Sequence, residues 1–236
     1  MLFRSWFSEV GVAQKIYLID FNQDLRLDIV TLEEKYSSPK VYIFNSKLEK
    51  FEKQKRKIFP KGFRSSFLIF DDFNKDGVVD FYSGQFYLNV EFYVPPGQLF
   101  KGSKKDLFFQ FEPLMNLFPN HRPHSGASIF DINRDGELEF LQTFWMRQSN
   151  RGNNFTAPEI KNIKNESYLI NEIDNNILKN GAPSWGSEIC DINNDNIIDV
   201  LIANTSGHEN FVLIGSEKNE MQYLESAHKK IGRAHV

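Results

Sequence analysis

The 236-residue sequence is poor in cysteine and histidine, with one and five residues respectively. A single cysteine excludes an internal disulfide framework. Cys190 stands in an apolar run typical of a strand, so a buried and unreactive thiol is expected. No stretch approaches the roughly 20 apolar residues of a membrane-spanning helix. Residues 1–12 include Arg4 and Glu9 and lack an apolar run, so they do not match a secretory signal.

Aspartate and asparagine, by contrast, recur in a fixed pattern. Four nine-residue segments have Asp at position 1, Asn at position 3, Asp at position 5 and an acid at position 9. They cover residues 20–28, 72–80, 131–139 and 191–199, and their first residues lie 52, 59 and 60 positions apart. One copy would be weak evidence, because Asp and Asn are common in turns. Four copies in near register indicate an internal repeat.

The spacing within each segment suits calcium. Calcium binds roughly six to eight oxygens from carboxylates, amides and backbone carbonyls. Side chains at positions 1, 3, 5 and 9 and the carbonyl of position 7 can converge on one ion if the chain turns sharply at position 6. Gly77 and Gly136 suit that turn because glycine adopts positive φ without a steric penalty. Asn196 is the next best residue there, whereas Leu25 is unfavourable.

The sequence therefore predicts up to four structural Ca²⁺ sites. The alternative is that the segments are polar hairpin turns, but three carboxylates within nine residues favour a bound cation. The predicted ligands are, loop by loop, Asp20, Asn22, Asp24, Arg26 and Asp28; Asp72, Asn74, Asp76, Val78 and Asp80; Asp131, Asn133, Asp135, Glu137 and Glu139; and Asp191, Asn193, Asp195, Ile197 and Asp199.

The loops are not EF-hands, because position 12 is Thr31, Ser83, Gln142 or Ile202 instead of glutamate. Short β-branched and aromatic runs flank each loop and indicate two antiparallel strands. Each unit then continues with a third strand, a polar turn and a fourth strand. The third strands are expected at 42–44, 99–100, 168–170 and 212–214, and the turns at 45–46, 102–103, 171–172 and 215–216.

Four-stranded antiparallel sheets repeated at this period are typical of β-propeller blades. The expected blades cover approximately residues 12–60, 61–122, 123–182 and 183–229. Residues 230–236 lack apolar periodicity and are expected to be a non-native tail.

Residues 125–136 and 184–204 resemble FG-GAP (VCBS-type) repeats, which build the propeller of integrin α-subunits and of many secreted bacterial proteins. The resemblance covers roughly residues 12–226. It implies an all-β propeller fragment with four blades of a larger ring, usually of seven, and calcium between the first two strands of each blade. It also implies an extracellular, cell-surface or periplasmic location. Leu25 departs from the pattern, so the first site is expected to be weak or empty and the second the most complete.

Ligand binding is expected on the face opposite the calcium loops. Long connections between second and third strands and the links between blades lie there, and such loops commonly carry recognition. Four calcium ions would change the net charge from −3 to +5, which favours an anionic polysaccharide, although a protein ligand is also open. The candidate residues are Trp145, Arg147, Arg151, His121, Arg122, His124 and Trp185.

These features predict a calcium-binding extracellular propeller that acts in adhesion or ligand binding. The alternative is a fragment of a calcium-dependent polysaccharide lyase or hydrolase on the same scaffold. No acid–base pair outside the loops converges on a cleft, so an enzyme is not expected. The basic residues match no nucleic-acid-binding motif, so nucleic acid is not an expected partner.

Overall fold

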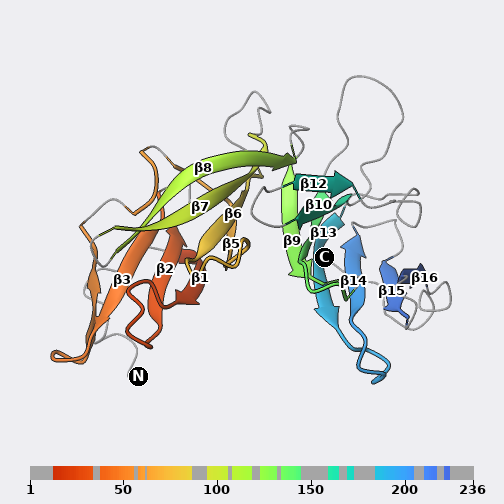
Figure 1. Cartoon of the computed structure of the whole chain (residues 1–236), viewed down its shortest axis with the longest axis horizontal. Helices are drawn as coiled ribbons and strands as arrows, with labels where there is room; N and C mark the ends of the chain where they lie inside the picture. The colour runs from red at the N-terminus through yellow and green to blue at the C-terminus, as the bar shows by residue number, and fades with distance from the viewer. Residues whose placement is uncertain are drawn as a thin grey trace. The chain divides into compact units, whose positions relative to one another are not determined.

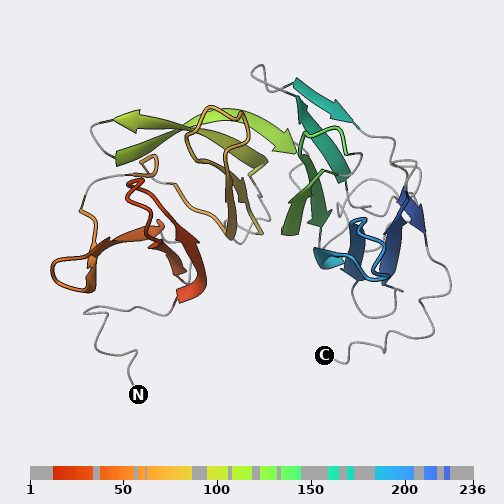
Figure 2. The ribbon, with the colours of Figure 1, turned by 60° about the horizontal axis from the view of Figure 1, so that its bottom comes forward.

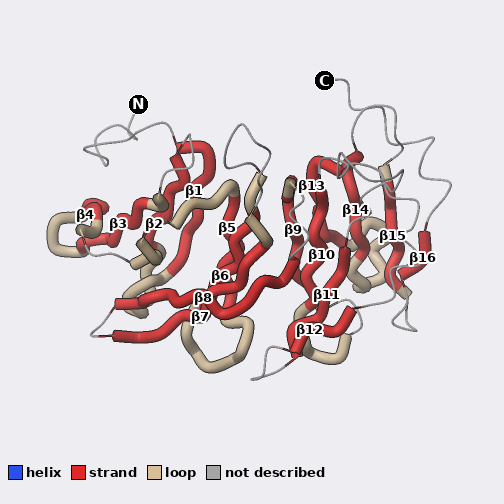
Figure 3. Tube along the Cα trace, turned by 90° about the horizontal axis from the view of Figure 1, so that it is seen from above, coloured by secondary structure: helices blue, strands red, loops and turns tan. Residues whose placement is uncertain are grey.

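The computed structural model describes residues 13–33, 38–55, 58–61, 63–86, 95–105, 108–118, 123–131, 134–144, 159–164, 169–172, 184–204, 210–216 and 221–223. Within these ranges the chain forms strands and no helix (Figure 3). The strands make four antiparallel four-stranded sheets, each with its strands in chain order. The predicted all-β fold of propeller blades is confirmed. No helix in the described part of the chain is long and apolar enough to cross a membrane.

The first compact unit contains two sheets (Figures 1 and 2). Its core is mostly aromatic: Phe81 and Phe100 stack with ring centroids 4.4 Å apart, and Phe59, Phe63 and Phe111 pack around them. One sheet consists of β1 (Ala13–Ile19), β2 (Asp28–Glu33), β3 (Lys40–Asn45) and β4 (Lys50–Lys53), and the other of β5 (Phe67–Asp71), β6 (Asp80–Gly84), β7 (Gly97–Lys105) and β8 (Phe108–Phe118).

The second unit also contains two sheets (Figure 1). Its core is more aliphatic, because Leu141 and Ile160 of one sheet pack with Val200, Ile202 and Leu213 of the other. One sheet consists of β9 (His124–Phe130), β10 (Glu139–Phe144), β11 (Glu159–Lys164) and β12 (Leu169–Glu172), and the other of β13 (Ser184–Cys190), β14 (Asp199–Asn204), β15 (Phe211–Gly215) and β16 (Met221–Tyr223).

Both units join their two sheets through the same positions of the repeat. We number first-strand residues backwards from the first aspartate of the loop. In the first unit, Tyr17 at position −3 accepts a hydrogen bond from the backbone N–H of Leu68, at position −4 of the next sheet (2.9 Å). In the second unit, Ser128 at position −3 lies 2.7 Å from Ser187 at position −4, hydroxyl to hydroxyl. Position −3 of one sheet therefore contacts position −4 of the following sheet.

The structure corrects the strand prediction in the third repeat. The expected third strand at 168–170 overlaps β12, which is the fourth strand, and β11 is the third. The sequence of β11, with apolar residues only at Ile160 and Ile163, lacks the alternation that indicates a strand. Pairing with β10 and burial of Ile160 place it in the sheet nevertheless.

The turn predicted at residues 102–103 is also wrong, because both residues lie inside β7. Gly102 is needed there for close approach, not for a turn. A Cβ at this position would collide with the backbone carbonyl oxygen of Val79.

Candidate functional site

The four aspartate loops share one conformation. Position 6 has positive φ in every loop, as predicted: 66° at Leu25, 80° at Gly77, 84° at Gly136 and 64° at Asn196. Position 4 is left-handed as well, and the sequence did not predict this. The residues there are Gln23, Lys75, Arg134 and Asn194, with φ between 57° and 59°. Asparagine tolerates this region, but glutamine, lysine and arginine give little signal for it in a sequence.

Backbone N–H groups hold the loop carboxylates in place. In the second loop, Asp72 accepts hydrogen bonds from the N–H groups of Asp76 (3.0 Å) and Gly77 (2.7 Å). Asp76 in turn accepts one from the N–H of Val78 (2.9 Å). The equivalent bonds recur in the other three loops at 2.8–3.1 Å. The side chains at positions 1 and 5 are therefore preorganised by the turn itself.

The acid at position 9 has a different environment. Asp28, Asp80, Glu139 and Asp199 are all 0% exposed. Asp199 accepts hydrogen bonds from the N–H of Ile192 in its own loop (2.8 Å) and from the N–H of Gly215 on the third strand (2.9 Å). This carboxylate thus ties the loop to two strands of its sheet.

Asp28 repeats this arrangement with the N–H groups of Phe21 (3.0 Å) and Phe44 (2.9 Å). Burial raises the pKa of Asp28 to about 6, even though both hydrogen bonds act to lower it, and the nearby Asp24 and Asp20 carboxylates raise it further.

A lysine lies beside the second loop. The Lys101 ammonium is 3.0 Å from Asp76 Oδ2. Partial burial acts to raise the pKa of Asp76, but hydrogen bonds from Lys101, Asn74 and Val78 outweigh it and lower the pKa overall. The sequence did not predict this ion pair, because Lys101 is 25 residues away from Asp76 along the chain.

The donor chemistry of the loops fits calcium better than a softer metal, since it consists of carboxylate, amide and carbonyl oxygens. Each carboxylate oxygen that accepts one N–H keeps a second lone pair for an ion. Among the described residues, however, no three acidic, histidine or cysteine side chains are grouped as a metal site. Asp at positions 1 and 5 would hold the ion with Asn at position 3 and the carbonyl of position 7. The acid at position 9, also a predicted ligand, is buried in every loop, and in Asp28 and Asp199 both carboxylate oxygens accept backbone N–H groups. Asn133, position 3 of the third loop, lies outside the described residues.

Neighbouring loops within each unit also touch. The Gln23 amide donates a hydrogen bond to the carbonyl of Gly77 (3.1 Å), and the Arg134 guanidinium donates one to the carbonyl of Asn196 (3.1 Å). In both cases the side chain at position 4 of one loop reaches position 6 of the next. The left-handed position 4 therefore serves the contact between blades.

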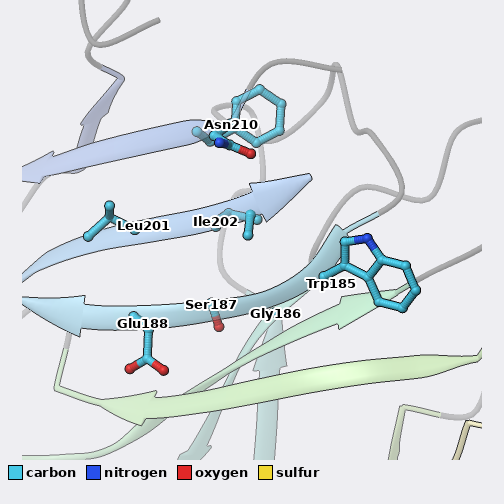
Figure 4. Close-up of a pocket in the computed structure, with 9 residues that line it drawn as sticks. Trp185, Gly186, Ser187, Glu188, Leu201, Ile202 and Asn210 are labelled. Atoms are coloured by element: carbon cyan, nitrogen blue, oxygen red, sulfur yellow. The ribbon is translucent and has the colours of Figure 1, made fainter. Parts of the chain in front are cut away.

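A pocket of about 440 Å³ lies on the fourth sheet, near the end of β13 away from its aspartate loop (Figure 4). It is lined by residues 185–188, 201–203, Asn210 and Phe211, and most of its wall is apolar. Trp185 is 49% exposed, whereas Asn210 accepts a hydrogen bond from the N–H of Asn204 (2.8 Å). Figure 4 shows Trp185 at one end of β13 and Glu188 farther along the same strand.

The structure places the predicted ligand-binding residues in different environments. Trp185 is half-exposed and lines the pocket, at the end of β13 away from the aspartate loop, and its role as a ligand-binding residue stays a prediction. His124 is 1% exposed and packs against the Phe144 ring, so its side chain is not accessible to a ligand. Trp145, Arg147, Arg151, His121 and Arg122 lie outside the described residues.

Cys190 is exposed, contrary to the expected buried thiol. At position −1 it points to the side of the fourth sheet that the third sheet does not cover. The apolar neighbours in sequence gave a misleading signal, because successive strand residues face opposite sides.

Comparison with known proteins supports the repeat and the fold. Residues 20–83 match the model of the FG-GAP-like repeat. A search of curated proteins found no match. Among solved structures, the chain is similar to an Agrocybe aegerita lectin described as specifically recognising non-reducing terminal N-acetylglucosamine. The TM-score is 0.51 at 15% identity, over 88% of this chain and 50% of the lectin.

This chain thus spans about half the length of the lectin, and at this identity the likeness concerns the fold alone. The repeat and the lectin are not described as enzymes. The chain therefore has the fold of β-propeller blades, and its residues 20–83 are similar to an FG-GAP-like repeat.

Proposed function

We propose that the protein is a calcium-binding, extracellular β-propeller module that binds carbohydrate in the pocket beside Trp185. The observation that carries the proposal is this pocket, with a half-exposed indole at its rim. Exposed aromatic faces suit the apolar faces of sugar rings, because they offer large contact area with little loss of side-chain entropy. The lectin with a similar fold supports a sugar as the ligand class.

Polar groups near the indole suit sugar hydroxyls. The Glu188 carboxylate is an acceptor on the exposed surface of β13. Asn210 uses its Oδ1 for the backbone of Asn204, which leaves its amide N–H groups as donors. A sugar could therefore stack on Trp185 while its hydroxyls bond to these two side chains.

Calcium has a structural role in this proposal. The loops follow the first strand of each sheet, whereas Trp185 is at the beginning of β13. The ion would hold the side chains at positions 1, 3 and 5 together, and it need not touch the ligand. The match to an FG-GAP-like repeat supports an extracellular location. Such a location would allow calcium affinities as weak as a dissociation constant of about 0.1–1 mM.

The test is titration of the protein with N-acetylglucosamine and, separately, with an acidic polysaccharide, monitored by calorimetry and indole fluorescence. Trp185→Ala should weaken sugar binding at least tenfold, and Leu48→Ala, which removes an exposed leucine of the turn between β3 and β4, should leave it unchanged. Sugar binding that survives Trp185→Ala would refute the pocket assignment. Binding of neither probe would refute the carbohydrate proposal, and cleavage of the polysaccharide would favour the enzyme alternative.

A further inference from the structure

The second aspartate loop has a cation of its own. Lys101 belongs to β7, the third strand of the sheet, and its ammonium lies 3.0 Å from Oδ2 of Asp76, at position 5 of the loop. In the β7–β8 ladder the residue opposite Lys101 is Glu112. Lys101 thus bonds to a predicted calcium ligand although another acid stands across the ladder from it.

The Oδ2 atom of Asp76 is more fully used than its counterpart in the fourth loop. Asp76 Oδ2 accepts hydrogen bonds from the Asn74 amide (2.8 Å) and from the Lys101 ammonium (3.0 Å). Within the described part of the chain, Asp195 Oδ2 accepts only the Asn193 amide (2.9 Å). A carboxylate oxygen has two lone pairs, so Asp76 Oδ2 has none left for an ion, whereas Asp195 Oδ2 keeps one.

The repeat shows that this lysine is particular to the second sheet. In the first, second and fourth sheets, the buried acid at position 9 accepts a hydrogen bond from a third-strand N–H. The donors are Phe44, Gly102 and Gly215. The residues immediately before these donors are Ile43, Lys101 and Ile214. The same place in the repeat therefore carries a cation in one sheet and an apolar side chain in two others.

An arginine also reaches the fourth loop, but it does not bond to a carboxylate there. The Arg134 guanidinium donates to the carbonyl of Asn196, at position 6, which is not a predicted ligand. Among the residues that the structure describes, no lysine or arginine forms an ion pair with Asp191 or Asp195. The fourth loop is therefore the natural reference for the second.

We propose that Lys101 is a tethered counter-ion that takes the place of calcium in the second loop, so that this loop is ordered without calcium and binds the ion more weakly than the fourth. The inference rests on the proposed calcium binding and adds which loops respond to the ion. The sequence alone favoured the second loop as the most complete site, and this lysine changes that order. Calcium must displace the ammonium or share Asp76 with it, and both lower its affinity.

Hydrogen–deuterium exchange of the whole chain, read by mass spectrometry on peptides covering residues 72–80 and 191–199, measures calcium binding in each loop separately. In the wild type, the fourth loop should gain protection at a lower calcium concentration than the second. Lys101→Met removes the charge of a half-exposed side chain and should lower the calcium concentration that the second loop needs by roughly three- to tenfold. With a chelator, residues 72–80 of this variant should exchange faster, because the loop then has no cation.

Two further variants separate the charge from the side chain. Lys101→Arg retains the positive charge and should keep the wild-type response to calcium. Lys53→Met removes an exposed lysine at the end of β4, in the first sheet, and should leave both loops unchanged.

The possible outcomes distinguish Lys101 from calcium binding itself. If the fourth loop responds to calcium but Lys101→Met leaves the response of the second unchanged, the role of Lys101 is overturned and the proposed calcium binding stands. Faster exchange of residues 72–80 in Lys101→Met that calcium does not reverse would also overturn the inference, since Lys101 would then be a structural ion pair only. If calcium protects no loop in any variant, the proposed calcium binding fails, and this inference with it.

Discussion

At the scale of single residues, position 6 of each loop shows how backbone strain is distributed among the repeats. Gly77 and Gly136 adopt positive φ without a steric penalty, and the space beside each is open. Leu25 adopts φ 66° with a side chain 95% exposed, so it gains no packing in exchange for the left-handed conformation. At position 6 the first loop is therefore strained and the second is not.

Substitutions at position 6 should have opposite effects in the two loops. Leu25→Gly should raise the free energy of unfolding by about 0.5–1 kcal/mol, because relief of left-handed strain exceeds the entropy cost of glycine. Gly77→Ala should lower it by about 1 kcal/mol for the converse reason. Urea unfolding in the presence of a chelator measures both values. A loss of stability in Leu25→Gly would show that the strain argument is wrong.

Tyr17 predicts a loss of stability at high pH. Burial raises its pKa to about 12, while the hydrogen bond from the Leu68 N–H acts to lower it. In the unfolded chain the pKa is about 10. The phenol therefore favours the folded state below pH 10, and this contribution disappears as the pH rises from about 10 to about 12.

Melting temperatures between pH 8 and pH 11 test this prediction. Wild-type stability should fall steeply above pH 10, and Tyr17→Phe should reduce the slope. The slope should not vanish, because burial also raises the pKa of Tyr82. Identical slopes in the two proteins would count against ionisation of Tyr17. At pH 8, Tyr17→Phe should also cost about 1–3 kcal/mol, because the buried Leu68 N–H loses its acceptor.

At the scale of structural elements, each aspartate loop has two groups of acids with different tasks. The acids at positions 1 and 5 shape the turn and present oxygens outward. The buried acid at position 9 joins the loop to the third strand, as Asp199 does through the N–H of Gly215. The loop and its sheet are therefore one hydrogen-bonded element even before any ion is considered.

Substitutions in the two groups of acids should affect stability differently, with and without calcium. Asp199→Asn should lower stability by about 1–3 kcal/mol with chelator present, because its amide N–H cannot accept the bonds that both carboxylate oxygens receive. Asp195→Asn, at an exposed position, should cost less under chelator but should abolish any calcium stabilisation of that loop. Thermal unfolding with and without calcium measures both. Equal losses under chelator would contradict the division.

Which elements could be predicted depended on how local their signals are. The flanking strands of the loops and the turn at position 6 were predictable, because alternation, glycine and asparagine carry that information within a few residues. The strand β11 was not, since Ile160 is held by pairing with Leu141 of β10, 19 residues earlier in the chain. Gly102 was taken for a turn residue because its close approach is to Val79 of the second loop, 23 residues earlier in the chain.

At the scale of the whole molecule, the proposed calcium sites predict linkage between ion binding and stability. At 10 mM calcium and dissociation constants of about 0.1–1 mM, each occupied loop should add about 1.4–2.7 kcal/mol. The melting temperature should therefore rise with calcium and fall on chelation, with magnesium as the control ion. The second loop should contribute less than its complete sequence suggests, because Lys101 already neutralises part of Asp76. No change in melting temperature with calcium would remove the metal-site proposal.

By itself the sequence determined the all-β fold, the four repeats and the acids of each loop, because these depend on residue spacing along one short segment. Only the tertiary structure decided which side of each strand is covered. It exposed Cys190, Ile16 and Leu18 and buried His124. It also placed Trp185 beside a pocket and Lys101 beside Asp76. Burial and ion pairing depend on residues brought together from distant parts of the chain, and neither spacing nor composition contains that information.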